Sequence, residues 1–429
     1  MKYVAVVILA ASGVIAASQE TVLYTFQGGN DGASPAGALI ADSSGNLYGT
    51  TQYGGGGNCA FPGSTGCGTV FELIPPSTGG SSWTEVVLYR FQGASDGAFP
   101  SPALLMDSAG NLYGATAAGG NTGACFTGAT GCGTVFRLQR PATTGGAWTE
   151  TVLYTFQGGA DGFGPGNLTA DKNGDLYSVT PYGGSASCQC GTVFKLSRPA
   201  AKGDAWTKTV LHTFQGIPNG QNFGDGAEPV LGVTLDSQGN LYGTTSWGGI
   251  YTGGEGGSSW GTVFFLAPPP QSGGSWNYLV LHRFSAYLQN PVSGVVIDKR
   301  GEVYGTTYGD AYVLSPGTAF PLYSFGGSSG YLPYGGVILE AGNLFGTTIG
   351  GGDQSGQGVV YELNRPAQAG SPWSETVLHE FTGSPDGEGP DAPLLLKDGV
   401  LYGTTLRGGN QGCQYAGSVG CGTVFQIEP

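Results

Sequence analysis

Short apolar runs separated by turn residues recur along this chain. The clearest run is Leu-Tyr-Gly-Thr-Thr, and close variants of it start at Leu47, Leu112, Leu176, Leu241, Val303, Leu344 and Leu401. Two further words, Gly-Thr-Val-Phe and Val-Leu-Tyr-x-Phe, recur with it in the same order. Runs of this length that are rich in Val, Tyr, Thr and Phe and bounded by Gly, Asn and Asp predict β-strands.

A fourth run completes each repeat unit. It precedes Leu-Tyr-Gly-Thr-Thr and ends in an Asp turn, as in residues 37–42 and 231–236. Asp at a turn start can accept backbone N–H bonds two residues on, and a following Gly permits the turn. We name the four runs a, b, c and d, after the examples GALIAD, NLYGTT, GTVFEL and WTETVLYTF. Seven units of four strands predict an all-β, seven-bladed β-propeller over residues 19–429.

The order of the runs predicts how the ring closes. The chain begins with a d run at residues 20–27 and ends with a c run at residues 422–427. We therefore expect the N-terminal strand to complete the seventh blade, which removes an exposed sheet edge. In the alternative phase, Val-Leu-Tyr-x-Phe opens each unit and the ring closes by packing alone. Units five and six are short, and we expect their blades to be irregular.

The N-terminus has the form of a secretory signal peptide. Lys2 precedes an apolar run over residues 3–17, and small residues follow at Ala16, Ala17 and Ser18. This pattern predicts cleavage after residue 18 and a secreted, extracellular protein. A buried strand or a membrane anchor is the alternative. No second apolar stretch of this kind follows, so we expect no membrane insertion.

Composition narrows the fold and the partners. The chain has 83 Gly and 25 Pro among 429 residues, which disfavours long helices. Aromatic residues make up 11%, which is too many for a disordered chain. Only 15 basic residues are present and the net charge is −14, so we expect no nucleic-acid partner. An acidic membrane surface is disfavoured for the same reason.

Eight cysteines lie in the loops between runs b and c. They form four close pairs, Cys59/Cys67, Cys125/Cys132, Cys188/Cys190 and Cys413/Cys421. An even number of Cys in an exported chain predicts disulfides, here four local ones. Zinc is the alternative, but all three His lie elsewhere and no other ligand set is present. We therefore predict no metal at these cysteines.

The b-to-c and d-to-a loops are expected on one face of the propeller, where function usually resides. The position before the Gly run that follows b varies between units, and it holds Tyr53, Ala118, Tyr182, Trp247 and Arg407. Further aromatics in these loops are Phe61, Phe126, Tyr251, Trp260 and Tyr415. Exposed rings suit a sugar- or peptide-binding groove. The alternative is that these rings pack over the Gly-rich loops.

The d-to-a loops carry a repeated Asp-Gly. It occurs at Asp31, Asp96, Asp161, Asp225 and Asp386. One interpretation is structural, because an Asp acceptor followed by Gly favours a turn. The other is a ring of carboxylates that binds Ca²⁺ or sugar hydroxyls, although one Asp per loop is few for Ca²⁺. No other cofactor is indicated.

The remaining candidates for chemistry are sparse. His212, His282 and His379 each replace the Tyr of run d, so we interpret them as structural. This leaves no His for a nucleophilic triad or a His-ligated metal on the loop face. The Trp residues at positions 83, 148, 206, 276 and 373 open d runs and are interpreted as blade packing. The unrepeated acids, which are the better enzyme candidates, are Glu255, Asp353, Glu388 and Asp391.

The words LYGTT, GTVFEL and ETVLYTFQGG resemble the GloVer (Gloeo/Verruco) tandem-repeat family over nearly the whole mature chain. The resemblance implies an exported repeat protein and brings no established activity. Members often end in a surface-anchoring segment. This sequence ends at Pro429 without one, so we expect free secretion.

Three functions are compatible with the sequence. The first is a monomeric, non-catalytic binding module, for glycans or a surface polymer. The second is a carboxylate-dependent glycosidase or lyase, which needs two carboxyl groups about 5 to 10 Å apart. The third is a structural matrix protein. A propeller fold does not by itself choose between them.

Overall fold

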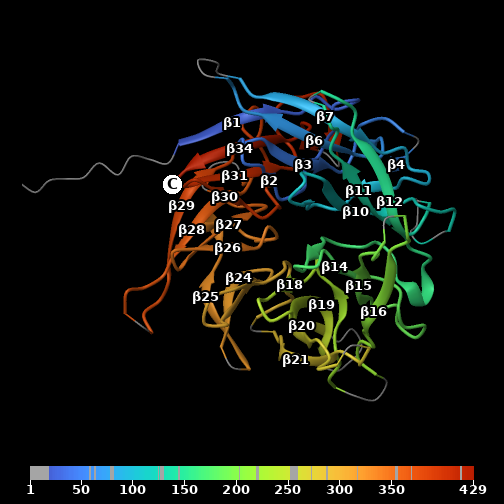
Figure 1. The fold of residues 1–429 in the computed structure, drawn as a ribbon. Coiled ribbons are helices and arrows are strands. Elements are labelled where there is room, and N and C mark those ends of the chain that lie inside the picture. Colours follow the sequence, from blue (N-terminus) through green and yellow to red (C-terminus); the bar gives the residue numbers. More distant parts are fainter. Residues whose placement is uncertain are drawn as a thin grey trace, which may run out of the picture.

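A computed structural model describes most of the chain, and in it the described residues form seven antiparallel blade sheets arranged in a ring (Figure 1). Five of these sheets have four strands, and in the other two the innermost strand is divided into two short strands. The described residues are 19–57, 59–61, 64–77, 82–123, 125, 130–143, 145–201, 203–218, 222–251, 259–271, 273–286, 288–315, 317–352, 356–368, 370–415 and 418–429. No α-helix occurs among them. The predicted seven-bladed β-propeller is therefore confirmed, whereas the proposed signal peptide, residues 1–18, lies outside the described residues.

Each blade runs from a short inner strand to a long outer strand. Blade one consists of β2 (Ile40–Ala41), β3 (Leu47–Thr51), β6 (Thr69–Ile74) and β7 (Thr84–Arg90). Blade two consists of β8 (Ala98–Pro100) with β9 (Leu105–Met106), β10 (Leu112–Ala118), β11 (Thr134–Gln139) and β12 (Thr149–Thr155). Blade three consists of β13 (Thr169–Ala170), β14 (Leu176–Thr180), β15 (Thr192–Ser197) and β16 (Thr207–Thr213). Blade four is β17 (Ala227–Pro229) with β18 (Thr234–Leu235), β19 (Leu241–Tyr251), β20 (Ser259–Ala267) and β21 (Asn277–Arg283).

Blade five consists of β22 (Val296–Ile297), β23 (Val303–Thr306), β24 (Asp310–Ser315) and β25 (Thr318–Ser324). Blade six consists of β26 (Val337–Glu340), β27 (Asn343–Thr348), β28 (Val359–Asn364) and β29 (Ser374–Glu380). Both have four strands, so the expectation that they are irregular is wrong. Their units are short because the loops are short, as at the tight β24–β25 connection.

The N-terminal strand closes the ring. Blade seven consists of β30 (Leu395–Lys397), β31 (Val400–Thr405), β34 (Thr423–Glu428) and, outermost, β1 (Gln19–Thr25). Strand β1 is antiparallel to β34, and the register pairs Glu20 with Ile427 and Val22 with Phe425. This confirms the predicted overlap, in which the two ends of the chain share one blade. Small hairpins, β4 (Ala60–Phe61) with β5 (Ser64–Thr65) and β32 (Gln414–Tyr415) with β33 (Ser418–Val419), extend from two cysteine loops.

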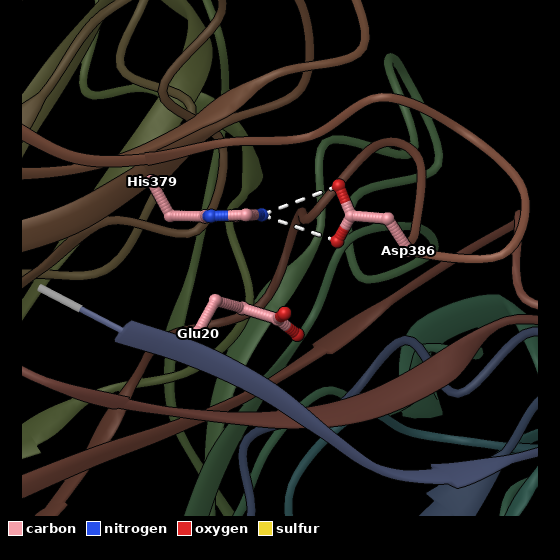
Figure 2. Close-up of side chains that lie close together, drawn as sticks. All are labelled: Glu20, His379 and Asp386. Carbon is pink, nitrogen blue, oxygen red and sulfur yellow. Dashed lines mark hydrogen bonds and ion pairs between the residues drawn. The ribbon is translucent and has the colours of Figure 1, made fainter.

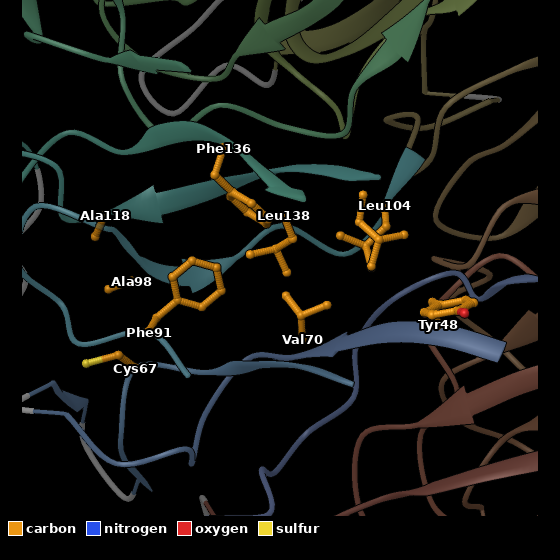
Figure 3. Close-up of a cluster of buried hydrophobic side chains, with 10 residues drawn as sticks. Tyr48, Cys67, Val70, Phe91, Ala98, Leu104, Ala118, Phe136 and Leu138 are labelled. Atoms are coloured by element: carbon orange, nitrogen blue, oxygen red, sulfur yellow. The ribbon is translucent and has the colours of Figure 1, made fainter. Parts of the chain in front are cut away.

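Aromatic pairs join every blade to the next. The Phe that ends each outer-strand word contacts the aromatic residue of the third strand in the following blade, with ring centroids 4.7 to 5.3 Å apart. The pairs are Phe26–Phe71, Phe91–Phe136, Phe156–Phe194, Phe214–Phe264, Phe284–Tyr312, Phe325–Tyr361 and Phe381–Phe425. Figure 3 shows the Phe91–Phe136 pair within the apolar core between blades one and two. The core is thus a ring of seven inter-blade layers, each worth several kcal/mol of apolar burial.

Two further features of the repeat words bring neighbouring blades into close contact. Thr50 donates a hydrogen bond to the carbonyl of Ser101 in the next blade, and Thr404 donates to that of Gly37 across the closure. In four of the five copies of Gly-Thr-Val-Phe the Gly adopts positive φ, which is 94° at Gly68, where a Cβ would overlap Pro100 of the next blade. Only Gly combines that φ with that close approach.

Candidate functional site

The loops that follow the second strand and those that follow the outer strand lie together on one face, which we call the loop face. Isolated bridges pair them, as in Ala33 with Tyr53, Phe163 with Tyr182 and Glu388 with Arg407. The variable position identified in the sequence is therefore fixed by backbone hydrogen bonds to the preceding inter-blade loop. These bridges position its side chain at the inner end of each blade.

Exposed aromatic side chains gather on the loop face of blades three to six. Trp247 is 39% exposed and Tyr182 is 37% exposed, so the expectation that these two rings are exposed is confirmed. Three other aromatics on the same loops are exposed, and the set forms what we call the aromatic arc: Tyr182, Phe223, Trp247, Tyr308 and Tyr331. Contiguous exposed apolar surface is typical of ligand and partner sites, which makes this set the candidate binding surface.

A cavity lies among the inner segments of the blades. It has a volume of about 260 Å³ and is lined by inner segments of blades one to four, including Pro100, Ser101 and Pro229. Pro181, the neighbour of Tyr182 in the chain, also lines it. Proline, glycine and small or apolar residues make up most of the lining, which includes no charged residue, so the cavity offers mainly apolar contact.

Two predicted binding residues are not on this exposed surface. Tyr53 is only 4% exposed, so the expectation that it is an exposed ring is wrong. It packs edge-on against Phe99 of blade two, with ring centroids 5.8 Å apart. Trp260 is half-buried in β20 opposite Ile250 and packs on the core between blades four and five. The rings of Phe61, Tyr251 and Tyr415, together with Phe126, Glu255 and Asp353, lie outside the described side chains.

Blade seven carries charge where blades three to six carry rings. The Nε of Arg407 lies 3.0 Å from Oε1 of Glu388. Asp391, on the inner segment of the same blade, has one carboxylate oxygen shielded from solvent without a hydrogen-bond partner. Burial raises the pKa of Asp391 to about 7, with the Arg407 charge opposing the shift. The structure thus brings together both described enzyme candidates, Glu388 and Asp391, around one Arg.

The five Asp-Gly carboxylates bind groups of the protein itself. In the first three, the tyrosine hydroxyl of the outer strand donates to the carboxylate, as in Tyr24 to Asp31 at 2.9 Å. In the other two, His212 and His379 take the place of the Tyr and contact Asp225 and Asp386. A backbone N–H also donates to four of them from four residues earlier and to Asp225 from Gln215, ten residues earlier. The donor to each of these Asp carboxylates is thus an N–H earlier in the chain, whereas the N–H two residues later donates at the Asp turn of run a, as from Ser44 to Asp42.

Beside each of these Asp residues lies the second residue of the next outer strand. At two junctions it is a Glu, Glu85 near Asp31 and Glu150 near Asp96, and burial raises the pKa of each to about 7. At the next it is Lys208, whose buried ammonium group lies 2.7 Å from Asp161 Oδ1. These junctions thus place either a proton or a cation beside the Asp carboxylate.

At the closing junction this pattern assembles the one group of three potential metal ligands found among the described residues. His379 Nε2 lies 3.1 Å from Asp386 Oδ1, and Glu20 on β1 completes the group (Figure 2). Their ligand atoms lie within 4.8 Å of one another. Burial raises the pKa of Glu20 to about 7, and His379 opposes the shift. The set could supply three ligands to a metal such as zinc. Sequence reasoning missed it because Glu20 is at the opposite end of the chain.

The cysteines are disulfide-bonded in the predicted pairs. The four bridges join Cys59–Cys67, Cys125–Cys132, Cys188–Cys190 and Cys413–Cys421, with Cα atoms 5.1 to 5.2 Å apart. The second Cys of each pair is buried beneath the loop face. The bridges therefore tie the candidate loops to the core, and the zinc alternative is excluded for these cysteines.

The comparisons with known proteins agree with the fold. The model of the Gloeobacter/Verrucomicrobia repeat matches residues 123–320, which confirms the family resemblance. A search of curated protein sequences found no match. Among solved structures, the extracellular domain of a one-component system from B. thetaiotaomicron is similar at a TM-score of 0.51 and 12% identity; the match covers 96% of this chain and 41% of that one.

Other solved structures are more distant. A protein described as a gluconolactonase is similar at a TM-score of 0.41 and 12% identity, covering 96% of this chain and 92% of that one. The PQQ-bound aldose sugar dehydrogenase from Streptomyces coelicolor gives 0.45 and 12%, covering 77% and 93%. At these identities the likeness concerns the fold alone. No helix among the described residues is long and apolar enough to span a membrane.

Proposed function

We propose, from the premise that the chain carries the Gloeobacter/Verrucomicrobia repeat, that it is an exported, non-catalytic binding module whose loop face holds a glycan or another surface polymer. The observation that carries this proposal is the aromatic arc on blades three to six. A polymer that lies across the face would stack on several rings in turn. Rings provide large contact areas at a small cost in side-chain entropy.

The chemistry of the loop face suits a neutral ligand. Arg407 is already paired with Glu388, and the Asp-Gly carboxylates are hydrogen-bonded within the protein. The four disulfides anchor loops of this face, which limits the entropy lost on binding. They also fit an oxidising extracellular location, as does the N-terminal pattern. The rings and their rigid loops therefore support binding by stacking more than by charge.

One observation favours a second candidate, a carboxylate-dependent enzyme. Asp391 has a pKa of about 7 and lies near Arg407 and Glu388. A carboxyl group that stays protonated near neutral pH can act as a general acid, with a second carboxylate as base or nucleophile. The Asp391→Asn variant tests this role without a change in side-chain size.

A panel of soluble and insoluble polysaccharides distinguishes the two proposals. The mature protein is incubated with each, and both protein depletion and release of sugars are measured. Depletion without sugar release supports the binding module. Sugar release that is lost in Asp391→Asn contradicts it and supports the enzyme. If neither occurs with any polysaccharide, the carbohydrate proposal fails and a structural matrix role is favoured.

A further inference from the structure

On the face opposite the loop face, a Trp–Tyr contact recurs at the blade junctions. The Trp immediately before an outer strand packs edge-on against the second-strand Tyr of the preceding blade. The ring centroids are 6.0 to 6.5 Å apart in the three pairs Tyr48–Trp148, Tyr113–Trp206 and Tyr177–Trp276. At these three junctions an indole ring thus covers the end that lies away from the loop face.

The junction between blades four and five lacks this Trp. Gly317 stands directly before β25, where five of the other six outer strands have Trp; in the sequence, Ser18 precedes β1. The register confirms the equivalence, because Thr318 pairs with Ser315 as Asn277 pairs with Ala267 one blade earlier. The space that an indole would fill is instead a cavity of about 380 Å³. Its lining includes Tyr242, the equivalent of the Tyr that the indole covers elsewhere.

The facing wall of blade four also departs from the repeat. Phe265 lines the cavity at a third-strand position that is charged or polar in most blades, with Glu72, Arg137, Lys195, Glu362 and Gln426 as its equivalents. Leu279, its cross-strand partner, is 48% exposed and corresponds to Thr151 and Thr209. An exposed Leu and a half-buried Phe at positions that are elsewhere polar leave apolar surface in water, which is unfavourable.

We propose that this cavity binds a small molecule that presents a planar aromatic ring of indole size. Three walls favour such a ring: Tyr242 and Phe265, whose centroids are 5.0 Å apart, and the aliphatic pair Leu279 and Leu281. The volume lies within the range of small-ligand sites. Arg300 and Glu302 at the rim are paired with each other, so the rim offers polar contacts without a free charge. This site is separate from the loop face and does not depend on the function proposed there.

Free indole is the probe for this proposal. Ligand-observed NMR and calorimetry on the mature protein should show saturable binding at one site. The Phe265→Glu variant restores the residue that blades one and six carry, and it should weaken indole binding at least about tenfold. The Phe320→Glu variant is the matched control, because Phe320 is 51% exposed on the outer strand of blade five and does not line the cavity. It should bind indole as the unmodified protein does.

A second variant keeps the test decisive. If Phe265→Glu fails to fold, Leu279→Thr, which restores the residue of blades two and three, should weaken indole binding in the same direction. Absence of saturable indole binding, or equal binding in the cavity and control variants, would show that the cavity is only a packing defect. Binding of a capped Gly-Trp-Gly peptide without binding of indole would also overturn the proposal, because the ligand would then be a polypeptide.

Discussion

Residues at equivalent positions of the repeat differ in burial, and the sequence of the repeat word alone does not predict which of them is exposed. Tyr53 and Tyr182 occupy the same place in their repeat words, yet one is buried and the other exposed. Tyr53 is covered by Phe99 of the next blade, whereas Tyr182 stacks on Phe163, with centroids 5.3 Å apart, and is 37% exposed. The repeat predicts the backbone position of a residue, and the residues of the neighbouring loop determine how much of its side chain is exposed to solvent.

Buried carboxyl groups should make stability depend on pH. Glu85 and Glu150 have pKa values of about 7, raised by burial from the ordinary 4.5. Between these values the folded protein retains protons that the unfolded chain has lost. The free energy of unfolding should therefore be highest below pH 4.5 and fall as the pH rises through 7. Urea unfolding at pH 5 and pH 8 measures this loss.

The Glu85→Gln/Glu150→Gln variant tests the assignment. It should flatten the pH dependence and be more stable than the unmodified protein at pH 8 by about 1 kcal/mol per site, a figure reduced for partial exposure. Glu340→Gln is the control, since Glu340 is exposed, and it should leave the pH dependence unchanged. An unaltered pH slope in the double variant would contradict this account.

At the scale of strands, the closure by β1 was predictable because the runs themselves are incomplete at each end of the sequence. The pairing register and the Glu20–His379–Asp386 cluster were not, since they depend on residues far apart in the chain. The Asp-Gly motif was partly predictable: its acceptor role is confirmed, but its Tyr and His partners, on the strand that leads into the loop, were not anticipated. The order of the strands can be predicted from the local sequence words. Contacts between residues of different words can be identified only once the closed ring of blades is known.

Phe26 tests whether the closing strand contributes as much as an internal one. Phe26→Ala removes a fully buried ring from the junction of blades seven and one, and Phe91→Ala removes its equivalent between blades one and two. Each should lower the free energy of unfolding by about 3 to 5 kcal/mol. Chemical denaturation compares them directly. A much smaller loss for Phe26→Ala would mean that β1 adds little to closure.

A disulfide is expected to stabilise its loop by a modest amount. The Cys125→Ala/Cys132→Ala variant opens a short loop on blade two and should cost about 2 kcal/mol in the chain-entropy model. Thermal unfolding of the variant, compared with the unmodified protein under non-reducing conditions, measures the cost. Equal melting temperatures would show that the loop is held by packing alone.

At the scale of the whole molecule, the sequence predicts a ring and two chemically different faces, because seven copies of the same words place equivalent loops together. It predicts Tyr182 and Trp247 of the aromatic arc but not Phe223 and Tyr331, which lie in loops after outer-strand words at positions that the words themselves do not cover. Function is accordingly expected where the repeat is broken, on the loop face and at the junction of blades four and five.

The central claim is that the aromatic arc binds the ligand, and an affinity measurement on ring-deleted variants tests it most directly. With the polysaccharide that depletes the mature protein, Trp247→Ala and Tyr182→Ala should each weaken binding about tenfold, or about 1 to 2 kcal/mol, without a change in melting temperature. Phe320→Ala, which removes an exposed ring far from the loop face, should bind normally. Unchanged affinity in both arc variants, or an equal loss in Phe320→Ala, would contradict the account.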